Sequence, residues 1–238
     1  MDSPSYQQIN GALKNAGFIA RGCLSIVDIP QAERCSDMAD FDCLILVGNA
    51  GAAFWENFSA ANDGSTHADP MDDWTRQSLE KLATHWNAKV LFPFEGPPFL
   101  PFQRWALRAD SVAESPLRLL FHSEYGLWHA YRGAMLLTNV PSDVPDISFV
   151  GGCSDCIEKP CLKSCPVNAC SLSGYDAPDC LQHLESNAGE SCMEQGCAAR
   201  LACPFGGQFC YVEHQRRFHM QAFRNNYSQL IKKEQTYE

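Results

Sequence analysis

The chain contains no hydrophobic run long enough to cross a membrane. Its longest apolar stretch, CLILVGNAGAAF from Cys43, falls well short of the ~20 residues that a membrane-spanning helix needs. The opening residues MDSPSYQQIN are polar and carry neither a basic segment followed by an apolar one nor a twin arginine, so we expect no export signal. These absences predict a cytoplasmic protein without a membrane span.

Positive charge is scarce as well. The chain has 18 Lys and Arg against 28 Asp and Glu, which gives a formal net charge of −10. Non-specific binding to nucleic acid depends on clustered Lys and Arg that neutralise phosphates, so we expect no nucleic-acid partner of that kind. The chain has 238 residues, of which 45% are hydrophobic, and this is enough for one large domain or two small ones.

Cysteine, in contrast, is abundant, with 13 residues. In a chain without an export signal, this number indicates a reducing compartment, where thiols bind metals more often than they form disulfides. Cys23, Cys35 and Cys43 are scattered through the N-terminal part, and we interpret them as small buried hydrophobic residues. The remaining cysteines lie close together in the C-terminal half.

Eight of these cysteines have spacings suited to metal ligation: Cys153, Cys156, Cys161, Cys165, Cys180, Cys192, Cys197 and Cys203. Cys165 and Cys203 are each followed by proline. A Cys-Pro that ends such a run is typical of a cysteine that ligates the other cluster of a two-cluster ferredoxin. Eight thiolates are what two [4Fe–4S] clusters need. Cys170 and Cys210 then remain as spare thiols.

Zinc is the alternative to iron–sulfur. Zinc sites are usually closed within each local group of four ligands. The two Cys-Pro endings and the isolated Cys180 favour the crossed ligation of a two-cluster ferredoxin instead. Four residues lie between Cys156 and Cys161, whereas the bacterial ferredoxin run has about two at this point. Because of this difference, zinc remains an alternative to iron–sulfur.

Apolar periodicity predicts the secondary structure of most of the chain. It favours helices over residues 6–22 and 69–86, and a C-terminal helix from residue 211 whose Phe218, Met220 and Phe223 pack on the cluster-bearing core. Strands are expected over residues 23–30, 41–51 and 90–94. Residues 95–110 are rich in proline and aromatic residues, so they form either a pocket lining or a loop over the core.

Residues 116–137 hold further candidates for a binding site. Arg132 stands between an aromatic segment and an apolar strand, where its guanidinium can contact a carboxylate or phosphate. His122 and His129 are either ligands or structural residues among aromatic side chains. Residues 140–149 contain two prolines and read as a linker, which predicts domains over residues 1–145 and 146–238.

The cysteine pattern resembles a known ferredoxin module. The order CxxC…C…CP, then a Cys within DCLQHL, then C…C…CP is similar to the module of epoxyqueuosine reductase and cobalamin-dependent reductive dehalogenases. This resemblance implies one cluster held by Cys153, Cys156, Cys161 and Cys203. It implies a second cluster held by Cys165, Cys180, Cys192 and Cys197.

The segment FHSEYGLWHAYRGAMLL of residues 121–137 resembles the cobalamin-processing CblC family. That family has an α+β, nitroreductase-like fold, so the resemblance implies the same fold for the N-terminal domain, followed by a bacterial-ferredoxin-like domain. It also implies that Trp128, Tyr131 and Arg132 line a cofactor pocket, with Arg132 on an anion or the substrate. The Lys-Asn-Thr triplet typical of epoxyqueuosine reductases is Arg132-Gly133-Ala134 here.

Together these features favour an iron–sulfur oxidoreductase that resembles a cobalamin reductase. Two clusters pass electrons from an external ferredoxin, flavodoxin or reductase to a corrinoid in the N-terminal domain, for removal of its upper ligand or for a corrinoid-dependent reduction. Two alternatives remain open: a ferredoxin-like electron carrier that binds no corrinoid, and a flavin-dependent reductase.

Overall fold

The protein is represented by a computed structural model, which describes residues 4–62, 68–149 and 151–234. Its contacts divide the chain into two units. The first comprises Met1–Val112 and His129–Val150, and the second comprises Ala113–Trp128 and Gly151–Glu238. The domain boundary near residue 145 stays a prediction, and the structure adds that the segment Ala113–Trp128 groups with the C-terminal residues.

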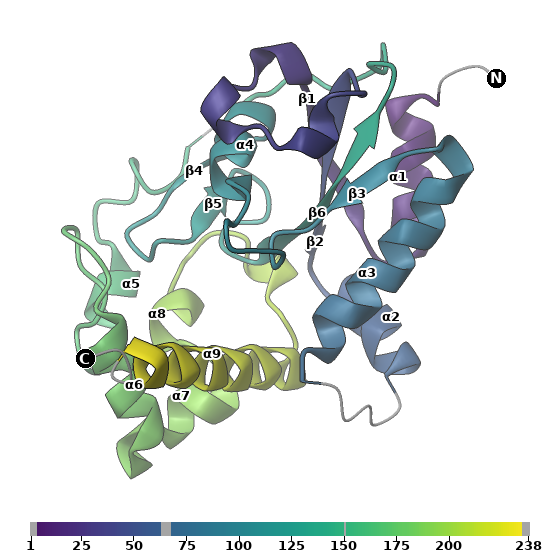
Figure 1. The fold of residues 1–238 in the computed structure, drawn as a ribbon. Coiled ribbons are helices and arrows are strands. Elements are labelled where there is room, and N and C mark those ends of the chain that lie inside the picture. The colour runs from purple at the N-terminus through teal and green to yellow at the C-terminus, as the bar shows by residue number, and fades with distance from the viewer. Residues whose placement is uncertain (1–3, 63–67, 150, 235–238) are drawn as a thin grey trace. The chain divides into compact units, whose positions relative to one another are not determined.

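The first unit is built on a four-stranded antiparallel sheet with strand order β1-β2-β6-β3 (Figure 1). The central strand β2 is buried from Cys43 to Asn49, because its apolar run packs on both faces. The strands are β1 (Ile19–Ser25), β2 (Cys43–Ala50), β3 (Lys89–Leu91) and β6 (His129–Leu137). This confirms the buried strand expected over residues 41–51.

Helices cover both sides of this sheet: α1 (Tyr6–Asn15), α2 (Ala53–Ala61) and α3 (Pro70–Ala83) lie on one side and α4 (Phe102–Ala109) on the other (Figure 1). Each side needs a glycine where a helix approaches a strand. A Cβ on Gly133 would lie 2.8 Å from a Leu79 methyl in α3, and one on Gly22 would lie 1.7 Å from the Ala109 carbonyl oxygen in α4. The amphipathic helix expected over residues 69–86 is confirmed by α3 and the 3-10 turn after it.

The helix predicted over residues 6–22 is wrong beyond Asn15. Helix α1 ends in a Schellman motif, in which the N–H of Phe18 donates to the Leu13 carbonyl and that of Gly17 to the Lys14 carbonyl. Gly17 has φ of 83°, which glycine adopts without strain. From Ile19 the chain pairs with β2 instead, so sheet hydrogen bonds override the helical spacing of the apolar residues.

The second unit is mostly helical. Its helices are α5 (Pro160–Lys163), α6 (Ala177–Glu185), α7 (Glu190–Gln195), α8 (Ala198–Leu201) and α9 (Glu213–Glu234), and a small sheet pairs β4 (Val112–Glu114) with β5 (Leu120–His122). Helix α9 packs on α6 and α7, where Met220 and Phe223 contact buried Leu184 and Met193. The expectation that these two α9 side chains pack beside the cysteines is confirmed.

Short 3-10 helices connect the longer elements: Ile26–Asp28, Gln31–Glu33, Ser36–Met38, Thr84–Trp86, Asn187–Gly189 and Gly207–Phe209. Within the described ranges, no helix combines the length and the apolar character that crossing a membrane requires.

Candidate metal centres and a buried polar site

Four cysteines of the second unit line a single pocket. Cys153, Cys156, Cys161 and Cys203 border a pocket that is partly open to solvent. Apolar side chains complete its wall, including those of Leu117, Leu127 and Phe205. Cys203 comes from the second cysteine run and the other three come from the first, so the chain closes this group across ~40 residues of sequence.

Lys159 holds the loop of the first group. Its ammonium group donates to the carbonyl oxygens of Cys153 and Cys156, at 2.7 and 3.1 Å. Lys159 has φ of 40°, and helix α5 begins directly after it, with Cys161 in its first turn. Burial raises the pKa of Cys153 to about 11, with smaller contributions from Cys203 and Cys161, while the Lys159 charge opposes the shift.

The other four cysteines form a second group. Cys180 lies in α6, Cys192 in α7 and Cys197 at the start of α8, and the sulfur of Cys165 accepts a hydrogen bond from the Ala169 N–H at 3.3 Å. Burial is the main reason that the pKa values of Cys180 and Cys197 are raised, and the charges of neighbouring thiols of this group add to it.

The two groups exchange one member each. Cys165 closes the first run of the sequence but adjoins Cys180 and Cys197, whereas the electrostatic neighbours of Cys203 are Cys156 and Cys161. Each group thus offers four thiols, the donor set of a [4Fe–4S] cluster. Because raised pKa values make uncompensated thiolates costly, a positively charged metal centre would relieve that cost as it displaces the protons.

Among the described residues, no three His, Cys, Asp or Glu side chains converge as the ligands of one metal ion do. A [4Fe–4S] cube offers a separate iron to each of four cysteines, so its ligands surround a space instead of meeting at one centre. The pocket bordered by Cys153, Cys156, Cys161 and Cys203 has this form.

The two spare cysteines differ in their surroundings. Cys170 is buried beside the second group, and burial raises its pKa to about 12, with further contributions from Cys197, Cys165 and Cys180. Cys210 instead lies near Arg216, whose Nη1 is 3.7 Å from its sulfur. Only the first of these thiols therefore belongs to the surroundings of a candidate metal centre.

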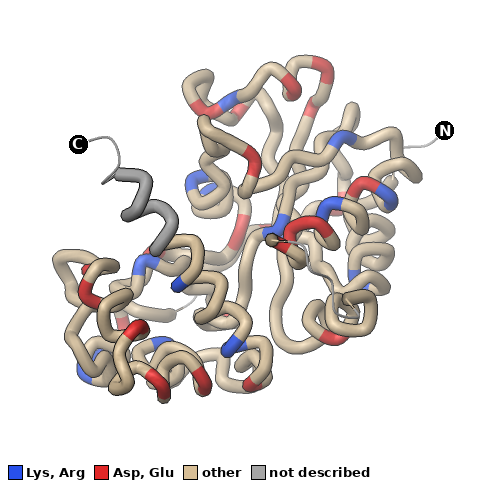
Figure 2. The backbone as a smooth tube through the Cα atoms, turned by 60° about the horizontal axis from the view of Figure 1, so that its bottom comes forward, with Lys and Arg blue, Asp and Glu red and all other residues tan. Residues whose placement is uncertain are grey.

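Charge also distinguishes the two groups. Between Lys163 and Arg200 the chain carries no Lys or Arg, but it carries five acidic residues: Asp176, Asp179, Glu185, Glu190 and Glu194. They lie on and around α6 and α7, the helices that supply Cys180 and Cys192 (Figure 2). Arg217 of α9 forms an ion pair with Glu194 in this region, whereas Lys159 adjoins the first group.

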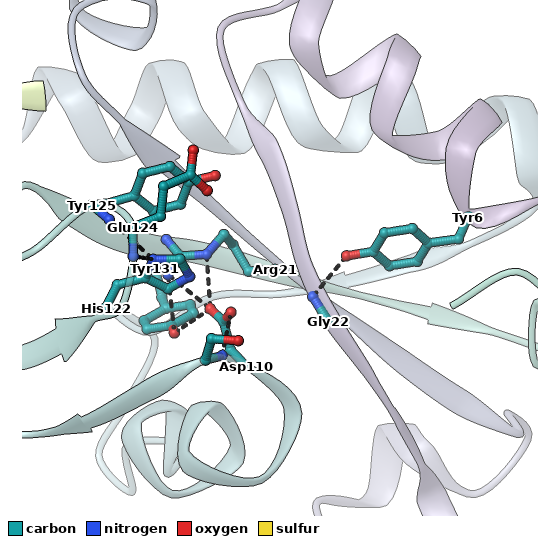
Figure 3. A network of polar contacts seen from close by, with 9 residues as sticks. Tyr6, Arg21, Gly22, Asp110, His122, Glu124, Tyr125 and Tyr131 are labelled. Atoms are coloured by element: carbon teal, nitrogen blue, oxygen red, sulfur yellow. Dashed lines mark hydrogen bonds and ion pairs between the residues drawn. The ribbon is translucent and has the colours of Figure 1, made fainter. Parts of the chain in front are cut away.

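The first unit contains a buried polar network (Figure 3). The Asp110 carboxylate accepts hydrogen bonds from Arg21 Nε at 2.8 Å and from the Tyr131 hydroxyl at 2.7 Å. Nearby, the Gly22 N–H donates to the Tyr6 hydroxyl at 2.8 Å. Burial raises the pKa of Tyr6 to about 12 and also raises that of Tyr131, so both phenols keep their protons at neutral pH.

Two β-bulges change the direction of the Arg21 and Arg132 side chains in this sheet. The β1–β2 register shifts between Ala20 and Cys23, at Arg21, and the β2–β6 register shifts at Val47 and Gly48, which leaves Arg132 as the extra residue of β6. A bulge interrupts the alternation of side chains and redirects one of them. The same dipeptide, Arg-Gly, stands at both bulges.

The three predicted cofactor residues have separate contacts. Tyr131 joins the Asp110 network, whereas Arg132 Nε donates to Asn49 Oδ1 at 2.9 Å and its guanidinium lies 4.6 Å from the centre of the Phe54 ring. Trp128 belongs to the second unit, where Arg200 stacks on it at 4.4 Å. Their role in cofactor binding stays a prediction.

Sequence reasoning missed Arg21 and Asp110. The available signal was an arginine within the apolar segment IARGCLS, which matches AYRGAML of β6 in its Arg-Gly pair.

His122, one of the two histidine candidates, has a structural role. Its Nδ1 accepts from the N–H groups of Glu124 and Tyr125 at 3.0 and 3.1 Å, and so it closes the turn before β6 (Figure 3).

No protein-family model matches the chain, and no curated protein matches its sequence. Solved structures do share its fold. The C. elegans B12-trafficking protein CblC aligns over 92% of this chain and 95% of its own, with a TM-score of 0.50 and 14% identity. A selenomethionine-labelled epoxyqueuosine reductase aligns over 89% of this chain and 68% of its own, with a TM-score of 0.50 and 15% identity.

The epoxyqueuosine reductase of Streptococcus thermophilus aligns over 84% of this chain and 65% of its own, with a TM-score of 0.51 and 15% identity. The chain thus spans about two thirds of the reductases and nearly all of CblC. At these identities the likeness establishes the fold alone. The protein has a mixed helical and β fold similar to those of CblC and epoxyqueuosine reductase.

Proposed function

We propose that the chain is a redox protein with two [4Fe–4S] clusters that passes electrons to a corrinoid bound by its first unit. The first cluster is held by Cys153, Cys156, Cys161 and Cys203, and the second by Cys165, Cys180, Cys192 and Cys197. The observation that carries this proposal is the exchange of Cys165 and Cys203 between the two sequence runs. Crossed ligation of this kind is typical of two-cluster ferredoxins.

The protein's own residues prepare these sites. Lys159 bridges two carbonyl groups, which fixes the loop that presents Cys153 and Cys156. Leu117, Leu127 and Phe205 surround the first site with apolar atoms and limit the access of water. When bound, the clusters supply single electrons from an external ferredoxin, flavodoxin or reductase.

The corrinoid part of the proposal rests on two supports. One is the fold, which is shared with a protein whose name describes B12 trafficking. The other is the resemblance of residues 121–137 to the CblC family. From this resemblance we also propose a nitroreductase-like fold for the first unit. Tyr131 and Arg132 lie within this segment at half-buried positions of β6, where a phenol and a guanidinium provide the polar groups that orient a ligand.

The test is anaerobic purification or reconstitution of the full chain, followed by titration with hydroxocobalamin. We expect about eight irons per chain, because two cubes hold four each. We also expect a change in the corrinoid absorption spectrum on binding. Zinc in place of iron under these conditions would overturn the cluster assignment.

Two further results would redirect the proposal. Flavin mononucleotide that binds while the corrinoid spectrum stays unchanged would favour a flavin-dependent reductase. Binding of neither molecule by the iron-loaded protein would leave a ferredoxin-like electron carrier, whose first unit has another role.

A further inference from the structure

A pocket lies at the end of the first unit's sheet where β1 and β6 end and β2 begins. It borders Ser25, the last residue of β1, Asp42, which directly precedes β2, and Val140, which follows β6. The buried polar network uses residues near the other ends of β1 and β6. The pocket is therefore a separate site within the same unit.

Residues 26–41 supply most of the pocket lining, and contacts with other elements hold this segment in place. The segment joins β1 to β2 through three 3-10 turns. In the second turn, the buried Glu33 accepts hydrogen bonds from Arg108 of α4 at 2.6 and 3.0 Å. In the third turn, Asp37 lies 2.7 Å from the ammonium group of Lys89 in β3. The lining is thus held before any ligand binds, as is usual for small-molecule sites.

The pocket combines an apolar floor with a polar rim. Ile26 and Met38, which are almost completely buried, form the floor, and the more exposed Phe41 and Val140 extend its apolar surface. Serine hydroxyl groups and the amide of Gln31 stand beside these side chains. An apolar surface with a few polar groups is the usual lining of a site for a small organic ligand.

Arg34 and Asp42 bring opposite charges to this lining. Arg34 donates through Nε to the Ile29 carbonyl at 2.7 Å and through Nη2 to the Val27 carbonyl at 3.0 Å, so its guanidinium is held and Nη1 is the end that meets a ligand. The Asp42 carboxylate is exposed, and its backbone is fixed because its carbonyl accepts from the Ile26 N–H at 2.8 Å. Both charges therefore have defined positions.

From this lining we infer that the pocket binds a small zwitterion of the amino-acid class, with its carboxylate at Arg34, its ammonium group at Asp42 and its apolar side chain on the floor. Guanidinium groups bind carboxylates, and carboxylates accept charge-assisted hydrogen bonds from ammonium groups. A zwitterion has no net charge, so the net charge of −10 does not repel it as it would repel a simple anion. A free apolar amino acid and a short apolar peptide share this chemistry.

The inference goes beyond the proposed function, since the pocket is lined by residues other than the assigned cluster ligands and the polar network. The test is calorimetric titration of the full chain with L-leucine, with isocaproate, which lacks the ammonium group, and with isoamylamine, which lacks the carboxylate. We expect leucine to bind at least about tenfold more tightly than either analogue, because each analogue leaves one charged side chain without its partner. Leucyl-leucine is the peptide probe: tighter binding than leucine identifies a peptide, and weaker binding identifies a free amino acid.

Asp42→Asn removes the charge that meets the ammonium group. It should weaken leucine about tenfold and leave the affinity for isocaproate unchanged, a difference that a general loss of structure does not produce. Asp40→Asn changes an exposed acidic residue outside the lining and is the matched control, with leucine affinity unchanged.

Cys35 provides a second readout, since it also lines the pocket. Saturating leucine should slow its alkylation by iodoacetamide, measured by peptide mass spectrometry, while the half-buried Cys23 outside the lining reacts at an unchanged rate. Absence of binding by both leucine and leucyl-leucine would overturn the inference. So would equal affinities for leucine and its two analogues, an equal loss of all probes in Asp42→Asn, or alkylation of Cys35 that the bound probe does not slow.

Discussion

Arg21 and Asp110 form a buried ion pair that joins β1 to the end of α4. Nη2 and Nε of the arginine lie 2.7 and 2.8 Å from the same carboxylate oxygen, and the two side chains are 2% and 10% exposed. The Tyr131 hydroxyl donates to that oxygen, and the Ser111 N–H donates to the other at 2.8 Å. The carboxylate is thus fully engaged, and the guanidinium depends on it for neutralisation.

Loss of this carboxylate should be costly. In Asp110→Ala the arginine charge would stay buried without its counter-ion, so we expect a loss of about 3–5 kcal/mol in the free energy of unfolding. Tyr131→Phe removes a single hydrogen bond and should cost about 1 kcal/mol. Urea unfolding followed by circular dichroism measures both changes. An Asp110→Ala variant within about 1 kcal/mol of the unmodified protein would show that the pair is well solvated.

Two glycines should respond to alanine in opposite ways. Gly22 has φ of 91°, and a Cβ there would lie 1.7 Å from the Ala109 carbonyl oxygen, so Gly22→Ala should destabilise the protein by at least about 1–2 kcal/mol. Gly11 is exposed within α1 with no heavy atom within 4 Å of its added Cβ, so Gly11→Ala should stabilise it by about 0.5–1 kcal/mol. Thermal unfolding of both variants in the same buffer shows whether each substitution raises or lowers the stability.

Pairs of cysteine variants test the crossed grouping. Cys153→Ala combined with Cys203→Ala should remove a single cluster and leave about four irons, because both residues belong to the first group. Cys153→Ala combined with Cys165→Ala should remove both clusters. Cys210→Ala, which lies outside both groups, should keep about eight irons. Equal iron loss in the two double variants would contradict the grouping.

Glu33 should contribute to stability in a pH-dependent way. Arg108 donates to its two carboxylate oxygens at 2.6 and 3.0 Å, and these hydrogen bonds lower the pKa of Glu33. A lowered pKa stabilises the fold above the ordinary carboxyl pKa, and this contribution disappears as the pH falls through the lowered value. Glu33→Gln should therefore be less stable than the unmodified protein at pH 7, and the difference should vanish in acid.

The measurement is the difference in unfolding free energy between Glu33→Gln and the unmodified protein across a pH series. Using the difference removes the pH dependence that both proteins share through their other titratable groups. Glu114→Gln, at an exposed position of β4, is the matched control and should show no such trend. If this difference in unfolding free energy stays constant from neutral to acid pH, the Glu33 carboxylate is not the source of the pH-dependent stability.

Sequence patterns predicted the helices and strands whose pattern lies within one continuous segment of the chain. The apolar run of β2 and the Pro-led amphipathic pattern of α3 could both be recognised in the sequence. The end of α1 was missed, because the apolar residues of β1 continue the helical spacing, and only pairing with β2 shows that they form a strand. Gly17, rather than Gly22, was the stop signal.

The polar network lay beyond sequence reasoning for a different reason. Arg21 and Asp110 are far apart in the chain, and their contact depends on a bulge that no periodicity reveals. Spacing identifies candidate ligands, whereas the residues that tune or orient them come from tertiary structure.

The grouping of Ala113–Trp128 with the C-terminal residues has a consequence for biosynthesis. Leu117, Phe121 and Leu127 belong to the same apolar cluster as Cys170 and Ala199, so they must wait for about 70 further residues to leave the ribosome. The strand β6 that completes the first sheet is made in that interval. Synthesis thus finishes the sheet first and only then supplies the chain that encloses the cysteines, which leaves the thiols of the first cysteine run accessible until late in translation.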